Sequence, residues 1–125
     1  MRRTLFAALL LPSLLLAQDK PHAELKTGTA VEKMEVVGES TDFKVPAGTR
    51  IFVWAKVTGA ADSTVTVVFS KGDKNSKQEL KVPRSPYRTH AYRTFRQGDD
   101  GEWTVKLLND QNAELGSATF KVEVQ

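Results

Sequence analysis

Residues 102–108 read EWTVKLL, and residues 117–124 read SATFKVEV. In both stretches, apolar side chains recur at every second position and alternate with polar ones. Successive side chains of a β-strand point to opposite faces, so this alternation predicts two strands with one buried face and one solvated face. The side chains expected in the core are Trp103, Val105, Leu107, Phe120 and Val122.

The same period of two continues toward the N-terminus, in residues 49–58, 63–70 and 77–83. Turn-forming residues separate these stretches, and residues 71–75 and 109–112 favour hairpin loops. Short strands with frequent turns, and no convincing amphipathic helix, predict an all-β fold. We expect an immunoglobulin-like antiparallel β-sandwich of seven or eight strands, with a lipocalin-like or partly open barrel as the alternative.

The first residues have the pattern of a secretory signal peptide. Arg2 and Arg3 precede an apolar run over residues 5–16, and the small residue Ala17 stands at a plausible cleavage point. The run is shorter than the roughly 20 residues that a membrane-spanning helix needs, so a retained anchor is the less favoured alternative. We therefore expect a signal peptide over residues 1–17 and a periplasmic or secreted protein.

Removal of this segment changes the charge of the chain. The full sequence carries a formal net charge of +3; without Arg2 and Arg3, its 18 Lys and Arg fall to 16 against 15 Asp and Glu, a net charge of +1. Such a balance gives no reason to expect nucleic-acid binding. The chain has no Cys, so its stability depends on a packed core rather than on disulfides. We expect a flexible lead over residues 18–25 and a single domain over residues 26–125.

Several segments occur in an order typical of a known family. They are Phe43 with Pro46-Ala47-Gly48, residues 51–60, Tyr87-Arg88-Thr89, and residues 101–105 followed by Phe120-Lys121-Val122. Together they resemble DUF2914, a bacterial family of domains of unknown function. The resemblance implies a compact all-β module of an exported or membrane-attached protein, without an assigned activity.

The chain departs from the family pattern at three positions. The family favours a His and a Trp in the third strand, where this chain has Val67 and Phe69. It also favours a Trp immediately before Arg88, where this chain has Tyr87. No functional residue is therefore carried over to the third strand.

The sequence offers little for catalysis. It has no Cys, no Gly-x-Ser-x-Gly nucleophile elbow and no His-Glu-x-x-His motif, and its two His residues lie far apart in the chain. Asp99, Asp100 and Glu102 favour a hairpin turn over a calcium site, because so short a loop cannot supply about six to eight oxygen ligands. We expect no enzyme activity, no cofactor and no metal site.

The most suggestive cluster lies between Arg84 and Arg96, a segment with no acidic residue. In a strand, even-numbered residues share a face, which places Arg88, His90, Tyr92 and Arg96 together. Guanidinium groups beside an aromatic ring are suited to carboxylates, phosphates or a sugar ring. The alternative is a solvated face whose Arg side chains pair with Glu and Asp of neighbouring strands.

Trp54 is a further candidate, because it is out of phase with Val53 and shares a face with Phe52. Either both faces of this strand are covered, or the two rings form an exposed patch that marks an interaction surface. Burial is the favoured prediction. The complete set of candidate ligand-binding residues is Arg84, Arg88, His90, Tyr92, Arg96 and Trp54.

These features favour an exported, non-catalytic binding or adaptor domain that acts on a protein partner or an envelope polymer. One alternative is a carbohydrate or cell-wall binding module, which needs aromatic rings on an open surface. Another is a structural subunit that assembles through an edge strand. We expect no nucleic-acid partner and no membrane span once the signal peptide is removed.

Overall fold

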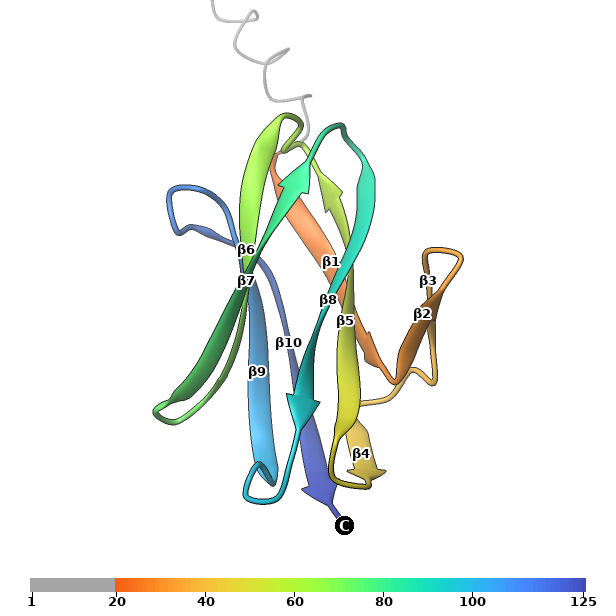
Figure 1. The fold of residues 1–125 in the computed structure, drawn as a ribbon. Helices are drawn as coiled ribbons and strands as arrows, with labels where there is room; N and C mark the ends of the chain where they lie inside the picture. Colours follow the sequence, from red (N-terminus) through yellow and green to blue (C-terminus); the bar gives the residue numbers. More distant parts are fainter. Residues whose placement is uncertain (1–19) are drawn as a thin grey trace, which may run out of the picture.

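The computed structural model describes residues 20–125, which form ten β-strands and no helix (Figure 1). The strands are β1 (His22–Gly28), β2 (Ala30–Glu32), β3 (Glu35–Val37), β4 (Asp42–Val45), β5 (Thr49–Thr58), β6 (Ser63–Lys71), β7 (Lys74–Val82), β8 (Tyr87–Phe95), β9 (Gly101–Leu108) and β10 (Glu114–Val124). The prediction of an all-β fold is confirmed. Ten strands occur where seven or eight were expected, because β2, β3 and β4 are short segments that the sequence pattern does not resolve.

The strands form three sheets. A three-stranded sheet has the order β1-β5-β8, a five-stranded sheet has the order β4-β10-β9-β6-β7, and β2 and β3 form a separate hairpin. Every pairing is antiparallel except that of β4 with β10, which is parallel. The five-stranded sheet is therefore mixed, whereas an entirely antiparallel arrangement was expected.

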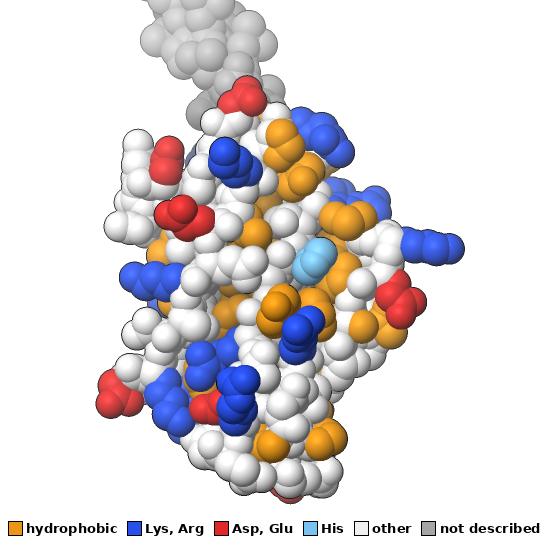
Figure 2. All heavy atoms as spheres, in the orientation of Figure 1, with side chains coloured by type: hydrophobic (Ala, Val, Ile, Leu, Met, Phe, Trp, Pro, Cys, Tyr) orange, Lys and Arg blue, Asp and Glu red, His pale blue; other side chains and the backbone are white. Residues whose placement is uncertain are grey.

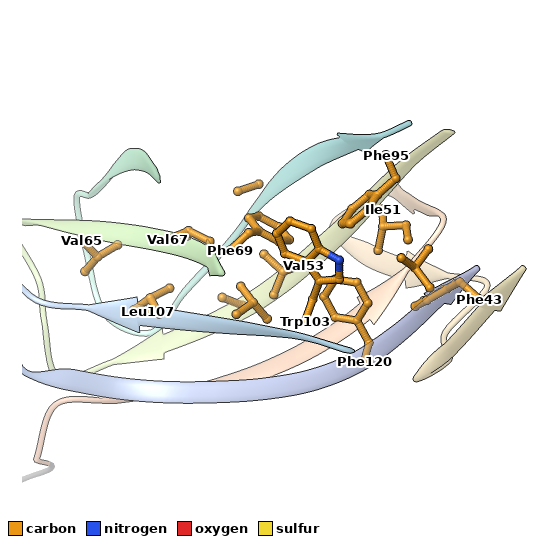
Figure 3. Packing of buried hydrophobic residues seen from close by; sticks show 14 of the residues in the cluster. Phe43, Ile51, Val53, Val65, Val67, Phe69, Phe95, Trp103, Leu107 and Phe120 are labelled. Carbon is orange, nitrogen blue, oxygen red and sulfur yellow. The ribbon is translucent and has the colours of Figure 1, made fainter. Parts of the chain in front are cut away.

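The two larger sheets face each other across one hydrophobic core, and Figure 3 shows its side chains filling the space between them. The three-stranded sheet contributes Phe95, whose ring packs edge-on against Trp103 at 5.2 Å and Phe120 at 5.8 Å between centroids. Both partners belong to the five-stranded sheet. The five core residues predicted from the alternation are all buried.

The first strand begins earlier than the sequence suggested. Residues 22–25 were assigned to a flexible lead, but they pair with β5, His22 opposite Thr58 and Leu25 opposite Ala55. The prediction of a flexible lead was wrong for residues 22–25, because Leu25 packs against the core and β1 forms one edge of the three-stranded sheet. The predicted signal peptide lies outside the described residues. Within residues 20–125, no helix is long and apolar enough to cross a membrane.

The loops follow the predictions with one exception. Residues 71–75 close the β6–β7 hairpin and residues 109–112 close the β9–β10 hairpin, as expected. Residues 99–101 were expected to form a hairpin turn, but the turn lies at Gln97 and Gly98, and Gly101 is already the first residue of β9. The turn is not part of a hairpin. It carries the chain from β8 in one sheet to β9 in the other, a change of sheet that the local sequence does not encode.

The two sheets approach closely where β1 passes β10. Gly116 of β10 leaves no space for a side chain, because a Cβ there would overlap the backbone carbonyl of Ala23 in β1. Neither backbone can give way without disturbing its own sheet.

We expect Gly116→Ala to lower the free energy of unfolding by about 1–3 kcal/mol, the usual cost of overpacking. Urea denaturation of the purified domain measures this loss. The matched control is Ser117→Ala at the adjacent exposed position, which should stay within about 0.5 kcal/mol of wild type. Equal stability of the two variants would contradict the close approach of β1 and β10.

Candidate functional site

The outward side of the three-stranded sheet gathers aromatic and cationic side chains. The pairing of β5 with β8 sets Phe52 opposite Tyr92, Trp54 opposite His90, and Lys56 opposite Arg88. All of these are even-numbered residues, whereas the odd-numbered residues of both strands face the core. Figure 2 shows hydrophobic side chains mixed with a histidine and basic side chains at the centre and right of the view. We call this surface the outer face, defined by Arg50, Phe52, Trp54, Lys56, Arg88, His90 and Tyr92.

Tyr92 is the centre of the outer face. Its ring lies 5.3 Å from that of Phe52 between centroids, and the guanidinium carbon of Arg50 lies 4.5 Å from its centroid. Phe52 also contacts His90, at 6.0 Å between ring centroids. Tyr92 remains 40% exposed, a large value for an aromatic side chain held by two neighbouring groups. The result is a small platform whose shape is fixed by packing but whose surface is open to solvent.

The structure brings together only part of the predicted strip. Arg88, His90 and Tyr92 share the outer face as the strand period predicts. Arg96 does not join them, because β8 ends at Phe95 and Arg96 begins the crossing to β9. Arg84 precedes β8, and its guanidinium carbon lies 5.1 Å from the ring centroid of Tyr87 at the other end of the strand.

The β2–β3 hairpin covers part of the outer face. The indole Nε1 of Trp54 donates a hydrogen bond of 2.7 Å to the carbonyl of Met34, and Arg88 donates one of 2.8 Å to the Glu35 carboxylate. Lys33 and Met34 form the tip of the hairpin with φ values of 51° and 62°, the two positive values that a tight two-residue turn requires.

Trp54 is consequently 5% exposed. The prediction that it is buried is confirmed, although the cover is a hairpin rather than a second sheet. Trp54 is therefore not an open ligand-binding surface, and its place in the candidate set is taken by two residues outside that set, although Phe52 was named beside Trp54. These are Arg50 and Phe52, which reach Tyr92 across the strand register rather than along the chain.

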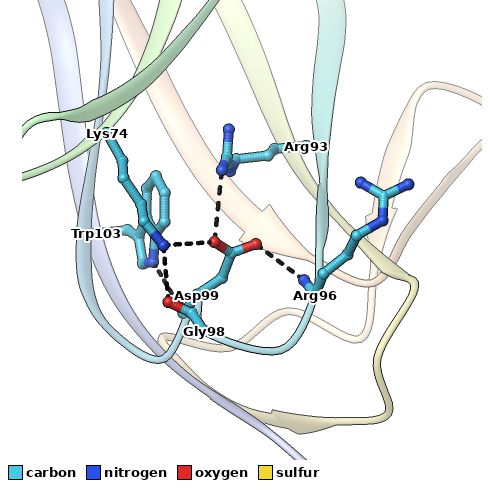
Figure 4. Close-up of polar contacts among 6 residues, drawn as sticks. All are labelled: Lys74, Arg93, Arg96, Gly98, Asp99 and Trp103. Atoms are coloured by element: carbon cyan, nitrogen blue, oxygen red, sulfur yellow. Dashed lines mark hydrogen bonds and ion pairs between the residues drawn. The ribbon is translucent and has the colours of Figure 1, made fainter.

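A second polar cluster lies where the chain crosses from β8 to β9. Asp99 is buried, and its carboxylate accepts hydrogen bonds from the amide of Arg96 at 2.9 Å and from Lys74 Nζ at 3.1 Å. Arg93 adds an ion pair at 3.7 Å, and the Asp99 carbonyl accepts the Trp103 indole N–H at 2.8 Å. Figure 4 shows the side chains of Lys74 and Arg93 directed at the carboxylate, whereas that of Arg96 points away.

These contacts determine the charge state of Asp99. Burial by itself raises the pKa of the carboxyl. The hydrogen bonds from Arg96 and Lys74, with the positive charges of Arg93 and Lys74, outweigh burial and hold the pKa below its ordinary value of 3.8. Asp99 is thus a carboxylate that fixes two cations beside the core.

Neither cluster has the composition of a metal centre: within residues 20–125, no three His, Cys, Asp or Glu side chains lie close enough to hold a metal ion. Residues 62–122 match the model of the family DUF2914, described as a protein of unknown function. This match covers β6 to most of β10 and confirms the family that the sequence resembles. No curated protein matches the chain.

We expect Trp54→Phe to loosen the β2–β3 hairpin without unfolding the domain, because a smaller aromatic ring still covers the position but the hydrogen bond to Met34 is lost. Amide hydrogen exchange of residues 30–37 should accelerate by about two- to tenfold, the equivalent of one hydrogen bond. Amides of β9 are the internal control and should be unchanged. Unaltered exchange in the hairpin would show that this bond does not hold it.

We expect Asp99→Asn to lower the free energy of unfolding at neutral pH by about 1.5–3 kcal/mol, because hydrogen bonds and ion pairs to a charged group are lost. A depressed pKa stabilises the folded state at pH above the unfolded-state value, and this stabilisation disappears as pH falls through the folded-state value. The difference between wild type and Asp99→Asn should therefore shrink below about pH 4. Denaturation at a series of pH values measures it.

The control for this measurement is Asp110→Asn, at an exposed position of the β9–β10 loop. Its difference from wild type should stay within about 0.5 kcal/mol at every pH. A difference between wild type and Asp99→Asn that persists unchanged to low pH would disprove the role of the carboxylate charge.

Proposed function

We propose that this chain, whose residues 62–122 place it in the DUF2914 family, is an exported, non-catalytic binding domain that holds a protein partner through its outer face. Export, to the periplasm or beyond, is supported by the signal-peptide pattern of residues 1–17. The lack of an evident nucleophile motif and of a metal cluster within residues 20–125 favours binding over catalysis.

We further propose that the fold is immunoglobulin-like. In this interpretation β1 and β4 are two halves of one divided strand, and β2–β3 is an insertion between them. The seven strands that remain have the order β1-β5-β8 in one sheet and β10-β9-β6-β7 in the other. In immunoglobulin nomenclature these strands correspond to A, B and E facing G, F, C and C′, with C′ in place of strand D of the constant domains, and this correspondence supports the proposal. The chain differs from antibody domains in having no Cys pair and in carrying its core Trp103 on β9.

One observation carries the functional proposal: Tyr92 is exposed on a face that contributes nothing to the main core, yet Phe52 and Arg50 hold it in place. Tyr and Arg are enriched at protein interfaces and among the residues that dominate binding energy. A tyrosine already fixed by its neighbours loses little side-chain entropy when a partner binds.

The same geometry favours a protein over a carbohydrate. A sugar ring needs an unobstructed aromatic face, but the hairpin covers Trp54, and the Arg50 guanidinium lies over the ring of Tyr92. A partner protein can instead use the exposed part of Tyr92 together with acidic groups placed near Arg50 and Lys56. Within residues 20–125, neither of these cations has an ion-pair partner.

The experiment places a photo-crosslinking amino acid at position 92 of the full chain in its native cells. The matched control places it at Thr119, an exposed position on β10 in the other large sheet. We expect a protein adduct from position 92 only, and about tenfold less of it when Arg50 is changed to Glu, because charge reversal repels an acidic partner. Circular dichroism verifies that the Arg50→Glu variant folds.

Equal adducts from positions 92 and 119 would refute the outer face as the interaction surface. So would an adduct that Arg50→Glu leaves unchanged. A crosslink from position 92 to glycan instead of protein would overturn the protein partner in favour of the carbohydrate alternative.

A further inference from the structure

Arg93 differs from the other cations of β8 because its side chain turns toward the edge of the core. It is an odd-numbered residue, so it points away from the outer face. Its guanidinium carbon lies 4.5 Å from the ring centroid of Trp103 and 5.7 Å from that of Phe95, and 20% of the side chain is exposed. Stacking on Trp103 thus fixes the plane of the guanidinium.

The guanidinium is poorly satisfied by the protein itself. Its Nε is buried and has no hydrogen-bond partner among residues 20–125. Its contact with the Asp99 carboxylate, at 3.7 Å, is an ion pair that is too long for a hydrogen bond. Arg presents five N–H donors, and buried polar groups normally find partners. Because Nε is buried, an acceptor from outside can reach only the Nη groups, on the 20% of the side chain that is exposed.

Lys74 stands beside Arg93 with donor capacity to spare. Its Nζ donates to the Gly98 carbonyl at 2.8 Å and to Asp99 at 3.1 Å, which uses two of three N–H groups, and its side chain is 43% exposed. Two cations thus share a single carboxylate, which leaves one net positive charge. Lys71 lies against Gly101, two residues after Asp99. Figure 2 shows basic side chains gathered around an acidic one in the lower left of the view.

We propose that Arg93 and Lys74 form a binding site for an oxyanion, a phosphate or carboxylate group, with Asp99 as the residue that positions both cations. The planar fork of a guanidinium matches the oxygen spacing of either group, and a charge-assisted hydrogen bond is stronger than a neutral one. This site is separate from the outer face and goes beyond the proposed function, because β8 directs Arg93 and Tyr92 to opposite sides.

The two tryptophans allow a direct test. Trp103 Nε1 donates to the Asp99 carbonyl within the site, whereas Trp54 lies beneath the hairpin on the outer face. We expect titration with sodium phosphate, at constant ionic strength maintained with sodium chloride, to shift the indole N–H resonance of Trp103 along a saturating curve. The Trp54 resonance should stay in place. A parallel titration with sodium acetate distinguishes the two oxyanion classes.

Saturation by phosphate alone identifies a phosphate site, saturation by acetate alone a carboxylate site, and saturation by both a general oxyanion site. Each of these outcomes supports the proposal. A Trp103 resonance that does not move, that moves in step with Trp54, or that responds equally to chloride alone would overturn it.

Variants separate this site from general charge effects. Arg93→Lys keeps the charge but removes the fork, and it should weaken binding about tenfold. Lys74→Gln should weaken phosphate or acetate binding to a similar extent, and it leaves the stacking of Arg93 on Trp103 intact. This variant therefore tests the site even if Arg93→Lys does not fold. The matched control is Lys44→Gln, an equal loss of charge at an exposed position of β4. An equal loss of affinity in Lys44→Gln and Lys74→Gln would reduce the effect to net charge and refute the site.

Discussion

The edge-on packing of Phe95 against two aromatic rings of the facing sheet fixes how the two large sheets stack on each other. Phe95 is the last residue of β8, and it packs edge-on against Trp103 and Phe120 from the facing sheet, with interplanar angles of 85° and 78°. Edge-to-face aromatic pairs have a preferred geometry in addition to their hydrophobic burial, so this contact limits both the distance and the rotation between the sheets. Because Phe95 must face inward, every second residue before it along β8 faces inward as well, and the residues between them face out.

That constraint explains the composition of the outer face. Once Val53 and Ala55 point into the core, Phe52 and Trp54 are forced outward, where apolar rings in water are unfavourable. The protein covers the two rings in different ways. Trp54 is enclosed by the β2–β3 hairpin, which also supplies an acceptor for its N–H, and Phe52 is shielded by Tyr92 and His90. Tyr92 is left as the exposed end of this packing, and for that reason it is the residue on which the binding proposal rests.

The period of two in the sequence correctly predicted which face of its strand each of several side chains occupies. It placed Trp103 and Phe120 in the core, and it put Arg88, His90 and Tyr92 on one face. It failed for contacts between distant segments. The bond from Trp54 to Met34 spans 20 positions and the pair of Arg88 with Glu35 spans 53, so no local pattern contains them. The Asp99 cluster was missed for a related reason, because a local motif for a turn does not reveal that the turn crosses between sheets.

The position of Arg93 also bears on how this domain avoids pairing through its strand edges. β8 and β7 are edge strands of the two sheets, and each presents unpaired backbone groups that could accept a strand from another chain. An inward-pointing charge on one edge and repeated lysines on the other, at Lys74, Lys77 and Lys81, are devices that discourage such pairing. Asp99 forms ion pairs with Arg93 of β8 and with Lys74 of β7, so one carboxylate holds a charged side chain at each of these two edges. These devices disfavour strand pairing at β7 and β8, two of the four edges of the large sheets, and they agree with the proposed binding surface on a sheet face.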